Sequence, residues 1–314
     1  MTWHTTHRGR LWWQVGTMVA IVVLGATVLL IRGLSTPHGS LGTPPPDTNT
    51  TTSTTTTTLP VSGKPTLAVK IDNVRAARPA TGLGGADVVY VEPVEGGLTR
   101  LIAVYQGEPP AVIGPVRSAR QADIEVLGQY GKPVLAYSGA APELLPTLRA
   151  ANVVNASPTE APGAYYRDAG RPAPHNLYLR PQRMPGGAVP AVQPVLQFGP
   201  APLPGGAAGR VDIAFRAATF GFSWSPDSGR WLVSMDGTPM TSTESGRLGA
   251  ATVIEQRVEV STVGQGKATI LRDGQEFDAT WTRPDISAPT RFHTASGAPL
   301  PLAPGPVWIL LVPA

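Results

Sequence analysis

The stretch "EGGLTRLIAVYQGEPPAVIGPVRSAR", residues 95–120, sets an apolar run between a Gly-Gly pair and a Gly-Pro pair. Within it, "LTRLIAVYQG" (98–107) predicts a β-strand bounded by turns. "TLAVKIDN" (66–73) and "ADVVYVEPV" (86–94) predict two strands before it. "QADIEVLGQYG" (121–131) predicts a helix after it, because Ile124, Leu127 and Tyr130 fall on one helical face and Gly131 ends the pattern.

Further along the chain, strands and helices continue to alternate. "KPVLAYSGA" (132–140) predicts a strand, and "APELLPTLRAA" (141–151) predicts a short helix entered through Pro142. This alternation predicts a mixed α/β domain over residues 66–183. Residues 184–207 are rich in proline and glycine, which predicts a connection between two domains.

Residues 208–314 predict a small, all-β domain, because strand-like runs are separated there by turn signals. The best hairpin candidates are Asp236-Gly237 and Asp273-Gly274. Tryptophans in this segment are predicted to pack in the core, with stacking on sugar rings as the alternative. They are Trp224, Trp231, Trp281 and Trp308.

The N-terminal part of the chain predicts a membrane anchor. Residues 11–31 carry no charge and, as a helix, would span about 30 Å, the thickness of a bilayer core. Arg8 and Arg10 precede this run, so the positive-inside rule places residues 1–10 in the cytoplasm and the globular domains outside the cell membrane. A cleaved signal peptide and a buried helix are the alternatives. Residues 32–65, rich in threonine and proline, predict a disordered linker.

Composition excludes several classes of function. The chain has no cysteine, so disulfides and thiolate chemistry are excluded. Without Arg8, Arg10 and Arg32, it has 22 basic against 21 acidic residues, so no nucleic-acid partner is expected. No Walker motif, G-x-G-x-x-G or H-E-x-x-H is present, and we expect neither a cofactor nor a metal. A carboxylate-only metal site of Asp72, Glu92 and Glu95 is a weaker alternative.

Three blocks of the sequence resemble a known family. They are "VKIDNVRAARPATGLGGADVVYVEPVEGGLTRLIAVY", "IGPVRSAR" and "YYRDAGRPAPHNLY". These blocks are similar to the N-terminal domain of the YerB-like bacterial envelope proteins, and residues 267–313 resemble that family's C-terminal part. The family is catalogued as a domain of unknown function and described as lipoproteins. The resemblance implies an extracytoplasmic protein without an established reaction. Because no cysteine can carry a lipid, an anchor must be the helix at residues 11–31.

Arginines in these blocks predict a site for an anion, because guanidinium groups bind carboxylates and phosphates with two hydrogen bonds. They are Arg100, Arg117, Arg120, Arg167 and Arg171. The alternative is that Glu92, Glu95, Asp123 and Asp168 pair with them in structural ion pairs. Asp72 and Asn73 follow a strand, where side chains often face ligands.

His175 and Asn176 lie in the sequence "APHNLY" and are further candidates for ligand contacts. The candidates for ligand contacts also include Ser118, Glu92 and Glu95. His175 is a candidate general base, with Ser138 or Ser118 as nucleophile and Asp168 as acid. The G-x-S-x-G pattern of serine hydrolases is absent around Ser138.

Two functions follow from these residues. We expect a membrane-tethered envelope protein that binds an anionic cell-wall component or a protein partner. The alternative is an extracytoplasmic cell-wall hydrolase that uses His175 as general base.

Overall fold

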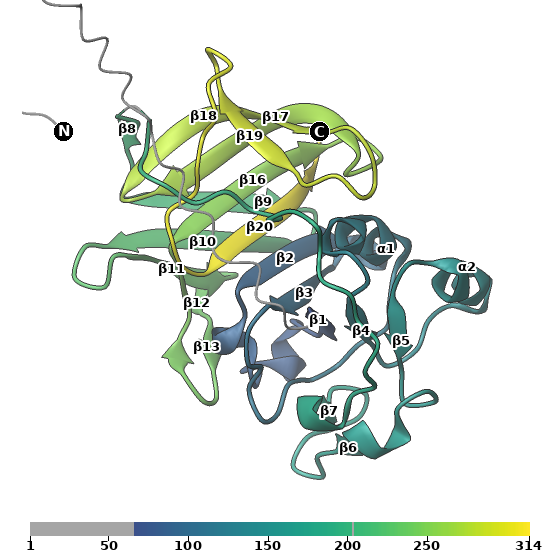
Figure 1. The fold of residues 1–314 in the computed structure, drawn as a ribbon. Coiled ribbons are helices and arrows are strands. Elements are labelled where there is room, and N and C mark those ends of the chain that lie inside the picture. Colours follow the sequence, from purple (N-terminus) through teal and green to yellow (C-terminus); the bar gives the residue numbers. More distant parts are fainter. Residues whose placement is uncertain (1–65, 203) are drawn as a thin grey trace, which may run out of the picture. The chain divides into compact units, whose positions relative to one another are not determined.

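The strands predicted from the sequence form one large sheet that runs through both predicted domains (Figure 1). The computed structural model describes residues 66–202 and 204–314. Its eleven-stranded sheet contains, in spatial order, β19 (Arg291–Thr294), β18 (Gln275–Arg283), β17 (Gly264–Arg272), β16 (Thr252–Val258), β20 (Val307–Pro313), β2 (Val88–Pro93), β3 (Thr99–Tyr105), β1 (Leu67–Ile71), β4 (Val134–Ala136) and β5 (Val154–Ala156), with β8 (Gly206–Ala207) paired to β18.

A second sheet has five strands. They are β12 (Thr238–Pro239), β11 (Arg230–Met235), β10 (Ala218–Ser225) and β9 (Arg210–Phe215), with β15 (Gly249–Ala250) paired to β11. Two small hairpins pair β13 (Thr241–Ser242) with β14 (Gly246–Arg247) and β6 (Tyr165–Arg167) with β7 (Leu177–Leu179).

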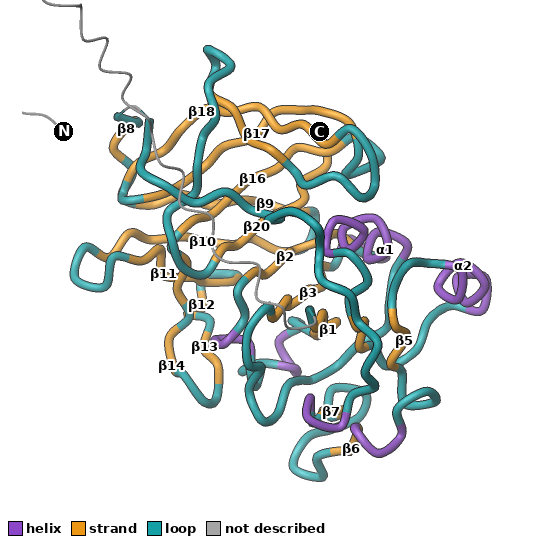
Figure 2. Tube along the Cα trace, in the orientation of Figure 1, coloured by secondary structure: helices purple, strands orange, loops and turns teal. Residues whose placement is uncertain are grey.

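Helices occur only before residue 184 in the described part of the chain (Figure 2). The α-helices are α1 (Gln121–Leu127) and α2 (Leu145–Ala150). Short 3-10 helices lie at Arg75–Ala77, Leu83–Gly85, Glu95–Gly97, Gly128–Tyr130, Pro142–Leu144, Pro162–Ala164 and Pro181–Arg183. The prediction of a mixed α/β segment followed by a small all-β sheet is therefore confirmed.

Pairing between the two segments was not predicted. β20, the last strand, lies between β16 and β2 and runs parallel to both, with Val307 opposite Val88 and Thr252 (Figure 1). Strand β16 and the strands beyond it thereby extend the N-terminal sheet. Hydrogen bonds thus join residues on both sides of the predicted connection at 184–207.

Each face of the large sheet covers a separate core. Trp308 and Leu310 of β20 belong to the core that the second sheet closes, together with Phe220 and Phe222 of β10. Ile309 and Leu311 alternate with them and face the second core, which contains Leu127. Burial on both faces explains the unbroken apolar run of β20.

Several local predictions are confirmed. Leu127 and Tyr130 are buried, and Ile124 packs beside them, as their helical spacing requires. Three of the four tryptophans, Trp231, Trp281 and Trp308, are at most 2% exposed, and Trp224 packs against the core. The predicted connection is itself partly in the core, since Val195, Leu196 and Phe198 are buried.

The predicted membrane anchor at residues 11–31 and the linker at 32–65 lie outside the described residues. Within residues 66–202 and 204–314, no helix combines the length and the apolar character needed to cross a membrane.

Both predicted hairpin turns form. Asp236 and Gly237 have φ of 53° and 73°, and Asp273 and Gly274 have φ of 53° and 71°, as a two-residue type I′ turn requires.

We expect Gly237→Ala to lower the free energy of unfolding by about 1 kcal/mol, because the left-handed backbone conformation disfavours a Cβ atom and no neighbouring atom adds a clash. An added Cβ at Gly274 would lie 2.7 Å from Trp224 Nε1, so Gly274→Ala should cost roughly 1 kcal/mol more. Urea unfolding of both variants checks this order, and equal losses would contradict it.

Candidate functional site

Several of the candidate site residues gather at one edge of the large sheet. Asp72 directly follows β1, Arg100 is the second residue of β3, and Ser138 lies shortly after β4. Residues 117–119 run between the ends of β1 and β4, since Arg117 N donates to Lys70 O, Ser138 N donates to Arg117 O, and Ala119 N donates to Gly139 O. The carboxyl ends of β1 and β4, which are parallel, therefore carry the candidate site.

Asp72 is the centre of this arrangement and is 1% exposed. Its Oδ2 lies 2.7 Å from His175 Nδ1 and 3.3 Å from Arg117 Nε, and its Oδ1 lies 3.7 Å from Arg100 Nε. One carboxylate thus orients an imidazole and two guanidinium groups. His175 and Arg117 remain partly exposed, with 20% and 24% of their side-chain surface open to solvent.

The outer ends of these two side chains have no protein partner. Among the described residues, nothing bonds to His175 Nε2 or to the terminal nitrogens of Arg117. Burial lowers the pKa of the Arg100 guanidinium, Asp72 opposes that shift, and the positive charges of Arg117 and Arg120 lower the pKa further. The guanidinium groups are therefore close enough to repel one another.

Glu92 and Asp123 do not pair with the arginines. Both contact Lys70, which projects from β1 and is fully buried; Asp123 Oδ1 accepts a hydrogen bond from Lys70 Nζ at 2.7 Å, and Glu92 forms an ion pair with the same nitrogen. Burial lowers the pKa of Lys70 to about 8, against the opposing effect of Asp123. Glu92, a candidate for ligand contacts, is 1% exposed and forms its ion pair with this buried cation.

Arg120 has an acidic partner, as the structural alternative predicted. Its Nε and Nη2 donate to Glu95 Oε2 at 2.9 and 2.8 Å, and this contact lowers the pKa of the Glu95 carboxyl. Its backbone N–H donates to Asp123 Oδ2 at the start of α1. Asp72, Glu92 and Glu95 hold different cations, so these three carboxylates do not form the carboxylate-only metal site.

Arg167 and Arg171 lie on and beside the β6–β7 hairpin and contact no carboxylate among the described residues. Arg167 Nη1 donates to Asn176 Oδ1 at 2.7 Å. Arg171 donates to Ala77 O and Pro79 O at 3.0 and 2.8 Å, which fastens the turn before His175 to the loop after β1. Within the described residues, neither arginine shares the Asp72 carboxylate with Arg117.

Two domain matches agree with this fold. Residues 50–190 match the N-terminal domain, and residues 211–309 the C-terminal domain, of the family described as "Protein of unknown function (DUF3048)". The chain belongs to the DUF3048 family. The resemblance to YerB-like proteins is thereby confirmed.

Two comparisons find a similar protein named YerB from Bacillus subtilis. The DUF3048 chain is 32% identical over 120 residues to "Putative lipoprotein YerB" of Bacillus subtilis (strain 168), a match that covers 38% of this chain and 36% of that protein. The matched part is thus about a third of the relative's length. The crystal structure of the YerB protein from Bacillus subtilis is similar with a TM-score of 0.68 and 21% identity, over 81% of this chain and 92% of that chain. At this identity the likeness concerns the fold.

The predicted serine nucleophiles are not in place in this DUF3048 chain. Ser118 Oγ and Ser138 Oγ lie 3.4 Å from each other, and neither bonds to His175 within the described residues. The predicted acid, Asp168, does not contact His175 in the described part of the chain. Asp168 accepts from Gly170 N at 2.9 Å, whereas Asp72 accepts from His175, because the turn that carries Asp168 folds back on itself.

Sequence reasoning missed two features of the site. Lys70 was not recognised, although a lysine inside the apolar strand "LAVKI" signals a buried cation with acidic partners. Asn73 was placed with the arginines, but its Nδ2 donates to Thr99 Oγ1 at 2.7 Å and contacts Met235 Sδ at 3.8 Å. Asn73 therefore faces a cavity toward the second sheet, which the sequence did not predict.

Proposed function

We propose that this DUF3048 protein is an envelope protein, tethered to the cell membrane by residues 11–31, that binds an anionic cell-wall component at the Asp72 site. The name of its relative, a lipoprotein, supports a place at the membrane. Since the chain has no cysteine, the uncharged run at residues 11–31 is the anchor that we propose. The globular part then lies outside the cell.

One observation carries the binding proposal. Asp72 holds Arg117 through Nε and His175 through Nδ1, which leaves the outer nitrogens of both side chains without a protein partner among the described residues. Hydrogen-bond donors that a buried carboxylate already orients lose little conformational entropy when an anion binds. Because Asp72 is the only carboxylate shared by Arg100 and Arg117 in the described part of the chain, this group of side chains keeps a positive surplus. The negative charge of a phosphate or carboxylate of a wall polymer would complement this positive charge.

Titration with soluble anions tests the proposal. We expect the full-length chain in a mild detergent to bind short glycerol-phosphate oligomers, as measured by calorimetry. Arg117→Ala should weaken this binding about ten- to hundredfold, because it removes a charge-assisted pair of hydrogen bonds. Arg149→Ala removes an equally charged, exposed side chain from α2 and is the matched control. Equal affinities of the two variants would contradict the proposal.

The contact between Asp72 and His175 also favours a second candidate function, a hydrolase acting on wall material. A carboxylate that accepts the Nδ1 proton leaves Nε2 of the neutral ring as a base. With no serine bonded to His175 in the described residues, the nucleophile would be a water molecule. Release of soluble fragments from isolated cell walls, lost in His175→Ala, would support this activity. Walls that stay intact with the wild-type chain would exclude it.

A further inference from the structure

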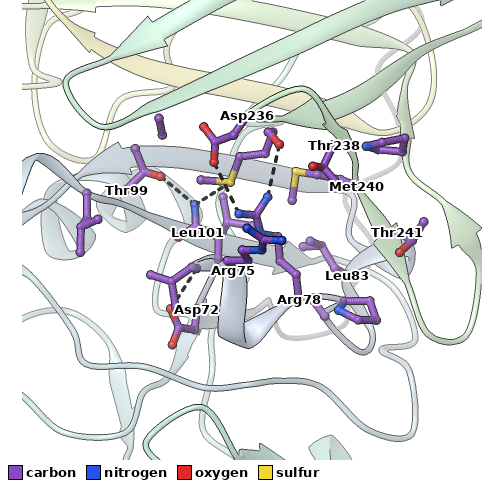
Figure 3. Close-up of a pocket in the computed structure, with 18 of the residues that line it drawn as sticks. Asp72, Arg75, Arg78, Leu83, Thr99, Leu101, Asp236, Thr238, Met240 and Thr241 are labelled. Atoms are coloured by element: carbon purple, nitrogen blue, oxygen red, sulfur yellow. Dashed lines mark hydrogen bonds and ion pairs between the residues drawn. The ribbon is translucent and has the colours of Figure 1, made fainter.

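A cavity of about 670 Å³ lies between the loop after β1 and the strands β11 to β13. Its size suits a small organic ligand. The cavity is distinct from the outer ends of Arg117 and His175, although Asp72 and Thr99 belong to its wall (Figure 3).

Two arginines supply positive charge to this cavity. Figure 3 shows Arg75 and Arg78 between Asp72 on one side and Asp236 on the other. Arg78 Nη1 donates to Met235 O at 3.3 Å, and Nη2 lies 3.4 Å from Asp236 Oδ2, an oxygen of a half-exposed side chain. Arg75 has no hydrogen bond or ion pair within the described residues. The carboxylate of Asp72 is already engaged by Arg117 and His175, so the cavity carries an excess of positive charge.

Two polar atoms in the wall lack partners. Arg78 Nε, a donor, and Asn73 Oδ1, an acceptor, are covered from solvent and form no hydrogen bond with any residue that the structure describes. Buried polar atoms are normally satisfied, so such a pair needs an explanation. A ligand that offers an acceptor to the arginine and a donor to the asparagine would satisfy both. Met235, whose sulfur contacts the Asn73 amide, is a flexible side chain that can move to admit it.

The rest of the wall alternates apolar and hydroxyl groups. Leucine and methionine side chains lie beside threonines in the lining; they are Leu83, Leu98, Leu101, Met240, Thr238 and Thr241. An acyl chain would offer no hydrogen bond to the threonine hydroxyls or to Asn73 Oδ1. A peptide matches both kinds of group, because its backbone N–H and C=O alternate with side chains.

We propose that this cavity binds the end of a short peptide with small aliphatic side chains and a free C-terminal carboxylate. The carboxylate lies against Arg75 and Arg78, a backbone N–H donates to Asn73 Oδ1, and the aliphatic side chains contact Met235 and Met240. The loop after β1 thus separates two sites, one on each side. Arg171 braces this loop through hydrogen bonds to Ala77 O and Pro79 O.

Calorimetry with N-acetylated dialanine tests this inference on the full-length chain in a mild detergent. The probe should bind as the free acid, in at least one stereochemical form, and its C-terminal amide should bind at least about tenfold more weakly. Arg75→Ala should reduce affinity for the acid about tenfold, and Arg149→Ala should leave it unchanged. Thr241→Trp, at an exposed position on the rim, should block binding while thermal unfolding stays that of the wild type.

Other outcomes would overturn the inference. Equal binding of the acid and the amide would exclude a carboxylate subsite, and no binding of any form would mean that the cavity holds water only. Decanoate that binds more tightly, with the same dependence on Arg75, would make the ligand a lipid. Affinity lost in Arg117→Ala but kept in Arg75→Ala would place the peptide carboxylate at the Asp72 site. Conversely, glycerol-phosphate binding should be unchanged in Arg75→Ala, so failure of either proposal is distinguishable from failure of the other.

Discussion

A chain that stops after Gly305 should not fold. It lacks β20, whose six residues from Val307 to Val312 are all at most 4% exposed. Burial of side chains of this size contributes roughly 1.5–3 kcal/mol each, so the strand accounts for about 9–18 kcal/mol, as much as the whole stability of a typical domain. Its loss would also leave β2 and β16 as unpaired edges in the middle of the sheet. Circular dichroism on heating should show no cooperative transition.

A point substitution in β20 tests the contribution of this strand to folding without shortening the chain. Ile309→Asp places a charge in the core, whereas Val260→Asp places it on a side chain that is 98% exposed. The first variant should behave like the truncated chain and the second like the wild type. A truncated chain that melts cooperatively near the wild-type temperature would show that the N-terminal segment does not depend on β20.

Replacing Lys70 by methionine should lower the free energy of unfolding by about 3–5 kcal/mol at pH 7. The substitution preserves volume but leaves Glu92 and Asp123 buried without their cation. Urea unfolding measures the loss. The triple variant Lys70→Met/Glu92→Leu/Asp123→Asn should recover most of it, because an apolar group replaces the ion pair and the asparagine keeps the contact at the start of α1.

The pH dependence identifies Lys70 specifically. Its pKa is lowered by burial from 10.5 to about 8, so the folded chain loses this proton at lower pH than the unfolded chain does. The contribution of Lys70 to the free energy of unfolding should therefore rise between about pH 8 and pH 10.5. That rise should be missing in Lys70→Met. A urea midpoint of Lys70→Met that equals the wild-type midpoint at pH 7 would contradict the structural role of the buried cation.

Local elements were predictable from the sequence, but their pairing was not. The apolar run within residues 98–107 and the Asp-Gly pairs at 236–237 and 273–274 are signals carried by neighbours in the chain. The run "VWILLV" in β20 indicates a strand buried on both faces, but no local signal names its partners. Val307 pairs with Val88, more than two hundred residues away, because the strand completes two cores at once.

The candidate site was also predictable only in part: its residues could be named from the sequence, but most of their contacts could not. Residue type identified the arginines, His175 and Asp72 as candidates, and the structure brings four of them together: Asp72, Arg100, Arg117 and His175. The partners of the acidic residues could not be read from the sequence, where Glu92 and Asp123 stand nearer to arginines than to Lys70. The cavity was missed because Arg75 and Met240 come from segments far apart in the chain.

Sedimentation with isolated cell walls tests the central claim, that the Asp72 site binds an anionic wall component. The full-length chain in a mild detergent should sediment with the walls, and Arg149→Ala should be retained equally. Arg117→Ala should remain largely in the supernatant at the same salt concentration. Equal retention of Arg117→Ala and the wild type would contradict the account.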